Sequence, residues 1–361
     1  MRIGVLTFHR AINIGGVLQA FALQHFLKEN GCQSEIIDYR CPTIEKQYYG
    51  RQFDLKFMKR IVSAIIRNGV IKVNTSKFED FRKHHLPISS RSYSPNNIET
   101  ANEEYSKFVV GSDQIWSSYC AGFDKAYFLD FVRGSNEKYS YAASFGGSEI
   151  PQELTPSYRE LLEDFSVISV RETAGAEIVK SVSAHDADVV LDPTLLLTES
   201  IWRKELITPI TVTRPFVLVY MIAECKELLA LARKIGEERN LDVIYISDRI
   251  YCPSGIISRR NVGPKDFLSL IDASEVVVTN SYHGICFSMI FKKDLYIGLL
   301  RRNTRVNARL LDVIRKYRLE SRLVSSDSFS NGSVIDFKFI TDTLVKEKKK
   351  SITWLRSLFD D

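Results

Sequence analysis

Short apolar runs alternate with segments of helical periodicity along most of the chain. Arg2–Phe8 is an apolar run typical of a buried strand, and Asn13–Gly16 is a polar, glycine-containing turn. Val17–Asn30 then places apolar side chains at helical spacing and stops at Gly31, after which Ser34–Tyr39 predicts a second strand. This order of strand, turn, helix and strand indicates a βα unit of a parallel sheet.

The same alternation continues on both sides of an interruption and a linker. The interruption spans residues 45–90 and predicts a helical insertion, and Thr208–Arg214 predicts a linker. We therefore expect an α/β protein of two Rossmann-like domains, residues 1–207 and 208–361, with a cleft between them. The further strands are predicted at Lys107–Val110, Tyr139–Ala143, Val167–Val170, Val189–Leu191, Phe216–Ile222, Asp242–Ile246, Glu275–Thr279 and Leu295–Leu299, and helices at Cys225–Asn240, Pro264–Ala273 and Ile285–Phe291.

Composition narrows the class of protein without naming a function. A length of 361 residues fits two domains of roughly 150 residues each. The formal net charge of +5, without a dense basic arm, argues against a nucleic-acid partner. The N-terminal apolar run is too short for a signal peptide, no long apolar stretch predicts a membrane span, and the six cysteines form no CxxC pair. These features predict a cytoplasmic, soluble protein with reduced thiols.

Glycines and polar residues at predicted strand ends suit anion binding, because ligands collect at the carboxyl ends of parallel strands. Asn13, Gly15 and Gly16 precede a helix whose first N–H groups can face an anion, although an ordinary tight turn fits equally well. Ser144 lies in a small-residue loop that either borders a ligand or is simply a turn. Arg171 directly follows a strand, where its guanidinium can hold a phosphate or carboxylate or form a surface ion pair.

A second polar cluster follows the strand that begins at Lys107. Ser112, Asp113, Gln114 and Trp116 can together hold a polyol and stack on a sugar ring, with Asp113 accepting a hydroxyl proton. The alternative is a helix N-cap. The related strand exit at Asp192 is interpreted as a structural Asp-Pro turn.

The most specific cluster follows the strand Glu275–Thr279. Ser281, Tyr282, His283 and Gly284 occupy the corner between this strand and the next helix. A histidine at such a corner can act as general acid or base, and the helix start can bind phosphate. A structural histidine is the alternative.

A basic run downstream can complete an anion pocket or form the solvated face of a helix. The basic run consists of Arg301, Arg302, Asn303, Arg305, Asn307 and Arg309.

The sequence contains no Ser-His-Asp order, HExxH, Walker loop or histidine spacing typical of a metal site. Neither a metal nor another cofactor is therefore indicated, and loosely bound magnesium stays open as an alternative.

Taken together, six segments in this order resemble the polysaccharide pyruvyl transferase family. The resemblance implies a fold similar to GT-B glycosyltransferases. It also implies transfer of the enolpyruvyl unit of phosphoenolpyruvate to a sugar of a capsule, exopolysaccharide or other cell-surface polysaccharide, forming a ketal and releasing phosphate. The segments are Gly4–Gln24, Phe108–Trp116, Tyr141–Gly146, Ser169–Glu172, Val190–Leu197 and Thr279–Phe291.

The resemblance also implies roles for individual residues. Family members commonly use the residues that match Arg171 and His283, whereas many have Arg or Phe at the position of Ser281, so we substitute Arg305 as the second anion contact. We expect Arg171 and Arg305 to clamp the donor, the Gly284 N–H to hold phosphate and His283 to carry the proton. Asp113 and Gln114 are expected to position the sugar, Asn303 to line the anion pocket, the first domain to bind the acceptor and the second to bind the donor.

Two peripheral segments bear on the acceptor and on localisation. The basic, amphipathic Phe53–Arg67 and the tail after Lys346–Lys350, with Trp354, Leu355 and Leu358, suit contact with an anionic membrane and a lipid-linked sugar at the inner face of the plasma membrane. The alternative is a tail that packs back across the domains.

Two other functions stay open. One is a nucleotide-sugar glycosyltransferase, for which Ser247 and Asp248 end a predicted strand of the second half. The other is a non-catalytic sugar-binding relative.

Overall fold

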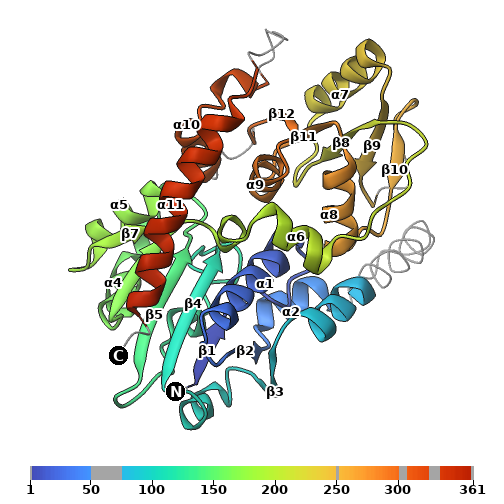
Figure 1. Ribbon diagram of the computed structural model, residues 1–361. Coiled ribbons are helices and arrows are strands. Elements are labelled where there is room, and N and C mark those ends of the chain that lie inside the picture. Colours follow the sequence, from blue (N-terminus) through green and yellow to red (C-terminus); the bar gives the residue numbers. More distant parts are fainter. Residues whose placement is uncertain (1, 50–74, 249–251, 301–306, 325–333, 359–361) are drawn as a thin grey trace, which may run out of the picture.

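The computed structural model describes residues 2–49, 75–248, 252–300, 307–324 and 334–358. Within these ranges, each half of the sequence forms one parallel sheet with helices packed against it (Figure 1). The predicted α/β architecture is therefore confirmed. The amphipathic segment Phe53–Arg67 and the candidate residues Asn303 and Arg305 lie outside the described residues.

The first sheet has seven strands in the order β3-β2-β1-β4-β5-β6-β7. The chain moves outward from β1 to β3 and then returns to add β4 on the other side of β1. The crevice between β1 and β4 is thus a topological switch point, where ligands bind in open α/β sheets. The strands are β1 (Ile3–Leu6), β2 (Ser34–Tyr39), β3 (Ile88–Tyr93), β4 (Lys107–Asp113), β5 (Glu137–Ala143), β6 (Val167–Val170) and β7 (Ala187–Val189).

The second sheet has five strands in the order β10-β9-β8-β11-β12, with its switch point between β8 and β11. The strands are β8 (Phe216–Tyr220), β9 (Asp242–Ile246), β10 (Ile257–Arg259), β11 (Val276–Thr279) and β12 (Asp294–Ile297). The main helices of the chain are α1 (Ile14–Glu29), α2 (Pro42–Tyr48), α4 (Thr155–Glu163), α5 (Thr173–Val182), α6 (Glu199–Leu206), α7 (Lys226–Arg239), α8 (Pro264–Ala273), α9 (Tyr282–Ile290), α10 (Ala308–Lys316) and α11 (Phe337–Ser357).

Several predicted bounds differ from the structure at strand ends. Strand β4 continues to Asp113 instead of ending at Val110, and helix α9 begins at Tyr282 instead of Ile285. The earlier start has a local cause, because the Ser281 hydroxyl accepts a hydrogen bond from the Gly284 N–H and caps the helix. His283 therefore lies in the first turn of α9.

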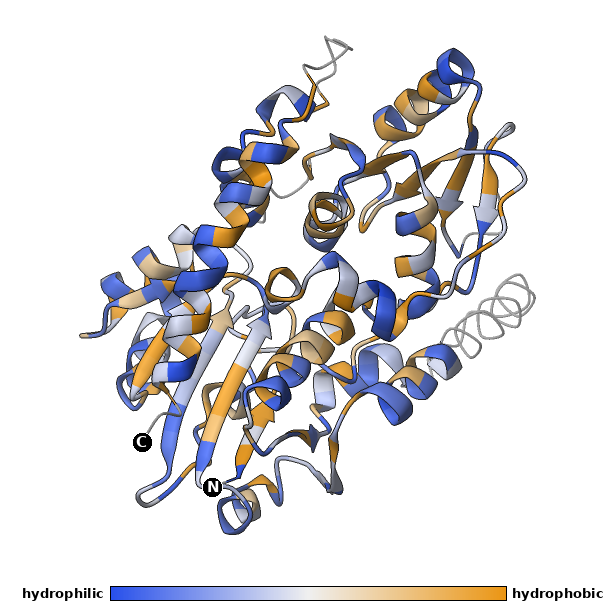
Figure 2. Cartoon of the chain, in the orientation of Figure 1, coloured by the Kyte–Doolittle hydropathy of each residue, from blue (hydrophilic) through white to orange (hydrophobic). Residues whose placement is uncertain are grey.

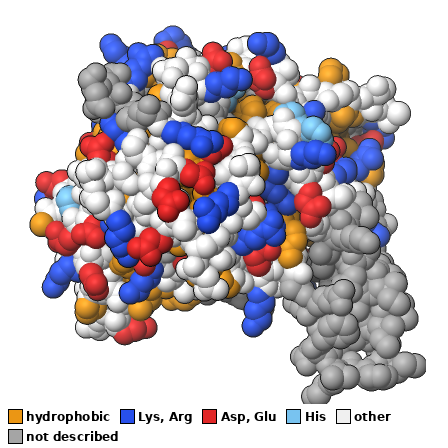
Figure 3. Space-filling view, turned by 90° about the horizontal axis from the view of Figure 1, so that it is seen from below, with side chains coloured by type: hydrophobic (Ala, Val, Ile, Leu, Met, Phe, Trp, Pro, Cys, Tyr) orange, Lys and Arg blue, Asp and Glu red, His pale blue; other side chains and the backbone are white. Residues whose placement is uncertain are grey.

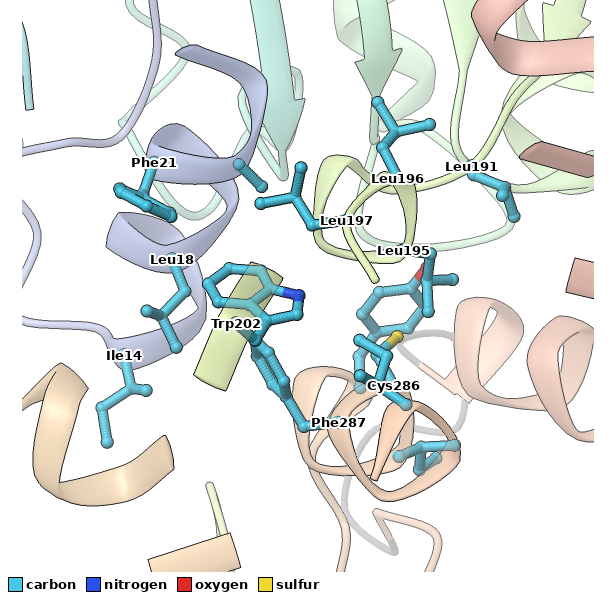
Figure 4. Close-up of a cluster of buried hydrophobic side chains, with 14 of the residues drawn as sticks. Ile14, Leu18, Phe21, Leu191, Leu195, Leu196, Leu197, Trp202, Cys286 and Phe287 are labelled. Carbon is cyan, nitrogen blue, oxygen red and sulfur yellow. The ribbon is translucent and has the colours of Figure 1, made fainter. Parts of the chain in front are cut away.

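Helix α1 is buried on nearly all sides because it packs between the first sheet and the second domain. Phe21 of α1 contacts Trp202 of α6 with ring centroids 5.6 Å apart, and Trp202 contacts Phe287 of α9 at 5.0 Å. Figure 4 shows the Trp202 indole between Leu18 of α1 and Phe287. One apolar cluster thus joins the two halves next to their strand ends.

The C-terminal helix α11 packs against the first domain. Its Ser351 hydroxyl accepts a hydrogen bond from the Leu191 N–H at 2.9 Å, and the Trp354 indole N–H donates to Asp188 at 3.0 Å. Leu355 and Leu358 are buried in this packing. Their side chains are therefore not exposed to a membrane, contrary to the membrane-contact interpretation of this face of the tail.

The surface agrees with the small net charge. Figure 2 shows apolar residues concentrated in the strands and in the helix faces toward them, and the view in Figure 3 shows basic and acidic side chains interspersed. Among the described residues, no helix combines the length and apolar character needed to cross a bilayer.

Candidate active site

Residues from both domains meet at the carboxyl ends of the two sheets. His283, in the first turn of α9, packs directly on Gly15, in the first turn of α1. A Cβ on Gly15 would overlap the imidazole, so glycine is required for this approach. The neighbouring Gly16 faces Asp113, whose Oδ2 would lie 3.3 Å from a Cβ there. The structure thus brings together four residues that the sequence analysis singled out separately.

Asp192, which the sequence analysis assigned to a turn, is the centre of this site. It is fully buried, and its Oδ2 accepts a hydrogen bond from Arg171 Nη1 at 2.8 Å and lies 3.5 Å from His283 Nε2. Its Oδ1 accepts hydrogen bonds from the Thr194 N–H and hydroxyl. Burial alone raises the pKa of Asp192, but His283 and Arg171 outweigh it and hold the pKa well below its ordinary range. The signal in the sequence was an acidic residue directly after an apolar run.

Arg171 is held on three sides and keeps one edge without hydrogen bonds. Its guanidinium lies over the Tyr282 ring at 4.4 Å, a cation–π contact, and Nη1 pairs with Asp192. Among the described residues, Nε and Nη2 find no hydrogen-bond acceptor, and Glu172 and Asp113 lie 3.7 Å from them. When these two carboxylates move aside, this edge can make two parallel bonds to a carboxylate or phosphate.

Asp113 and Glu172 place two further carboxyl groups at the site. Asp113 has φ 79°, a strained backbone conformation of the kind found at functional sites, and its Oδ1 accepts the Gln114 N–H at 2.9 Å. Glu172 Oε1 accepts the Ser144 hydroxyl at 2.7 Å, and Oε2 has no hydrogen-bond partner in the described part of the chain. Burial raises the pKa of Glu172, although Arg171 opposes this shift. The site therefore contains one carboxyl group whose pKa is lowered, Asp192, and one whose pKa is raised, Glu172.

The model of one protein family, polysaccharide pyruvyl transferase, matches residues 13–294. The chain belongs to the polysaccharide pyruvyl transferase family. The match covers every site residue described above, from Asn13 to Gly284. A comparison with curated proteins gives no match.

Solved structures of sugar enzymes share the fold of this family member. UDP-GlcNAc 2-epimerase from Methanocaldococcus jannaschii, in complex with UDP-GlcNAc and UDP, is 14% identical with a TM-score of 0.53 over the whole of both chains. UDP-GlcNAc 2-epimerase from Neisseria meningitidis is 10% identical, covering 98% of this chain and 93% of that one, with a TM-score of 0.46. The spinosyn rhamnosyltransferase SpnG is 11% identical, covering 99% and 100%, with a TM-score of 0.47. The likeness to the Methanocaldococcus jannaschii epimerase, whose TM-score exceeds 0.5, shows that the fold is of the GT-B type, as expected.

Several polar residues predicted to bind substrate instead bind protein groups in this family member. Asn13 and Ser281 cap helices α1 and α9 through Gly16 N–H and Gly284 N–H. The Ser112 hydroxyl lies 3.3 Å from Asp192, and Ser144 supports Glu172. Both serines are fully buried, so their hydroxyl groups support the carboxyl groups of Asp192 and Glu172.

One predicted contact with substrate, that of Trp116, is wrong. Trp116 is fully buried, stacks on Phe128 and donates its indole N–H to Tyr127 O at 3.0 Å, so neither face of its ring is open to a sugar. The Gly284 N–H donates to the Ser281 hydroxyl at 3.3 Å, and Gly284 packs against Thr279; its role in holding phosphate stays a prediction.

The remaining predicted residues are placed as follows. Gln114 is half-buried and its side-chain oxygen lies against Gly146. The Tyr282 ring is buried beneath Arg171. Among the described residues, no group of three or more His, Cys, Asp or Glu side chains is arranged to hold a metal ion.

Proposed function

We propose that this protein transfers the enolpyruvyl unit of phosphoenolpyruvate to a sugar of a cell-surface polysaccharide or its lipid-linked precursor, in the cytoplasm, forming a pyruvate ketal and releasing phosphate. The observation that carries this proposal is the contact of His283 with Asp192 beside the open edge of Arg171. A proton carrier and an anion-binding guanidinium thus lie within one buried cluster.

In the reaction, two C2–O bonds to the sugar form, the C2–O bond to phosphate breaks, and C3 of the donor gains a proton. A sugar hydroxyl oxygen bonds to C2 and loses its proton, while a proton is added to C3. C3 becomes a methyl group and C2 becomes the centre of a tetrahedral ketal phosphate. A second hydroxyl of the same sugar then bonds to C2, the C2–O bond to phosphate breaks, and the proton of that hydroxyl leaves. Phosphoenolpyruvate and a sugar diol thus give the cyclic ketal and inorganic phosphate.

His283 and Asp192 supply the proton chemistry in this proposal. Imidazole exchanges protons near neutral pH, which suits a general acid that donates to C3 and then accepts a hydroxyl proton. The Asp192 carboxylate, 3.5 Å from Nε2, stabilises the protonated imidazole and fixes its orientation. Asp192 is therefore a positioning residue, because its oxygens are occupied by protein groups.

In this proposal Arg171 binds the donor, and the carboxyl group of Asp113 binds the sugar. We assign the anionic donor to the Nε and Nη2 edge of Arg171, which makes no hydrogen bond to the described residues, because its phosphate and carboxylate need cationic donors. Asp113, with Gln114 beside it, accepts hydroxyl protons of the sugar from the first domain. Neither role requires a metal or an organic cofactor.

The test is incubation of the purified chain with phosphoenolpyruvate and candidate lipid-linked saccharides, followed by phosphate assay and mass spectrometry. We expect phosphate release together with a product heavier by one pyruvate less one water, and a large but measurable loss of both in His283→Gln. Release of a nucleoside diphosphate from a nucleotide sugar would favour the glycosyltransferase alternative. Sugar binding without dependence on phosphoenolpyruvate would favour the non-catalytic one.

A further inference from the structure

Arg309, in the first turn of α10, is a buried cation that has no counter-ion among the described residues. It is 7% exposed, and its Nε has no hydrogen-bond acceptor within the described ranges. No carboxylate of those ranges lies within ion-pair distance of it, whereas Arg171 has three carboxylates within 3.7 Å. The two guanidinium groups therefore differ, because one is neutralised by the protein and the other is not.

Arg309 nevertheless belongs to the same cluster as Arg171. Burial lowers the pKa of Arg309, the positive charge of Arg171 lowers it further, and the nearby Asp113 and Glu172 oppose these effects. Burial raises the pKa of the Cys120 thiol, on the first domain. Asp113 raises this pKa further, whereas Arg309 and Arg171 lower it. The geometry agrees, because Asp312 on the same helix as Arg309 is hydrogen-bonded to the Thr173 N–H, two residues after Arg171.

Local contacts hold Arg309 in this unfavourable place. Asp312, on the same helix, accepts the backbone N–H of Thr173 at 2.6 Å and so ties α10 to the start of α5, which follows Arg171 and Glu172. Asn307, just before α10, exchanges two hydrogen bonds with the backbone of Leu300. A buried, unpaired charge is destabilising, so these contacts keep it in place at a cost that an incoming anion would offset.

We infer that Arg309 receives an anionic group of the donor, a phosphate or a carboxylate, together with the Nε and Nη2 edge of Arg171. This inference rests on the proposed function for the identity of the donor. A phosphate between the two guanidinium groups would supply the acceptors that both lack within the described residues. The pair joins the two domains around the donor, because Arg171 follows β6 of the first sheet and Arg309 lies on α10 after the second.

The experiment is isothermal titration of the full chain with phosphoenolpyruvate and, separately, with inorganic phosphate. Arg309→Met keeps the apolar stem and removes the charge, and Arg315→Met removes an exposed charge from the same helix as a matched control. We expect Arg309→Met to raise the Kd for phosphoenolpyruvate about 10- to 100-fold, the loss typical of charge-assisted hydrogen bonds. Arg315→Met should stay within about twofold of the original chain, since exposed charges contribute little.

Thermal melting without ligand separates binding from folding. Because Arg309 has no counter-ion among the described residues, Arg309→Met should melt at the same temperature as the original chain or higher, which a structural ion-pair residue would not do. Arg309→Lys, which keeps the charge but loses the planar fork, should still raise the Kd several-fold. An unchanged Kd in Arg309→Met, equal losses in Arg309→Met and Arg315→Met, or no binding of either anion by the original chain would overturn the inference.

The outcomes also distinguish this inference from the proposed function. If the chain binds inorganic phosphate through Arg309 but forms no ketal, the proposed function fails and the anion site stands. If the chain forms the ketal and Arg309→Met keeps the KM for phosphoenolpyruvate, the anion site fails and the proposed function stands.

Discussion

The imidazole of His283 lies against the backbone of Gly15, so closely that a single methyl group on Gly15 would overlap it. These residues come from different domains, and His283 meets Asp192 through the same approach. The position of the proposed proton carrier therefore depends on a residue without a side chain.

Gly15→Ala should displace His283 and reduce ketal formation about 100-fold, because misplacing a catalytic group by about 1 Å costs this much. The measurement is kcat with phosphoenolpyruvate and the acceptor. If the loss acts through His283, adding Gly15→Ala to His283→Gln should cause no further loss in a double-mutant cycle. Additive losses would contradict this explanation.

Asp192→Asn should lower the free energy of unfolding at pH 7 by about 3–5 kcal/mol, because it breaks a buried ion pair with Arg171. Since the folded-state pKa of Asp192 lies below its unfolded value of about 3.9, this contribution is complete above that pH and is lost as pH falls below it. Urea denaturation at pH 7 and below pH 4 should therefore show the difference narrowing on acidification. Asp186→Asn, at an exposed aspartate, should show no such difference.

Arg171→Met should also lower the free energy of unfolding by about 3–5 kcal/mol, since it leaves three buried carboxyl groups without their cation. Burial already raises the pKa of Glu172, and loss of the guanidinium raises it further, so protonation relieves the variant. The destabilisation should be larger at pH 8 than at pH 5 in denaturant titrations. A pH-independent loss would argue against coupling between these groups.

Trp116→Phe should reduce stability without changing sugar affinity. The variant loses the hydrogen bond to Tyr127 O and leaves a small cavity, which together cost about 1–3 kcal/mol. The measurements are the urea midpoint and the KM for the acceptor. A raised KM with an unchanged midpoint would restore the stacking role that its burial excludes.

Local pattern determined the elements of this fold. The strands Ser34–Tyr39, Val167–Val170 and Asp242–Ile246 and the helix Pro264–Ala273 have the predicted bounds, because apolar runs and helical spacing are local properties. The meeting of Arg171, Asp113 and His283 also followed from one rule, since polar residues at the carboxyl ends of parallel strands converge.

Side-chain partners far along the sequence decided the rest. Asp192 is the centre of the site only because Arg171 and His283 reach it from other elements, and Trp116 is unavailable to a sugar because Phe128 and Tyr127 enclose it. In the sequence, Arg309 is one cation of a basic run, whereas the structure buries it with no counter-ion among the described residues. By itself, the sequence determined which groups end the strands. Only tertiary packing decided which of them are neutralised by the protein and which still lack a partner, because burial and charge pairing depend on neighbours that local pattern does not specify.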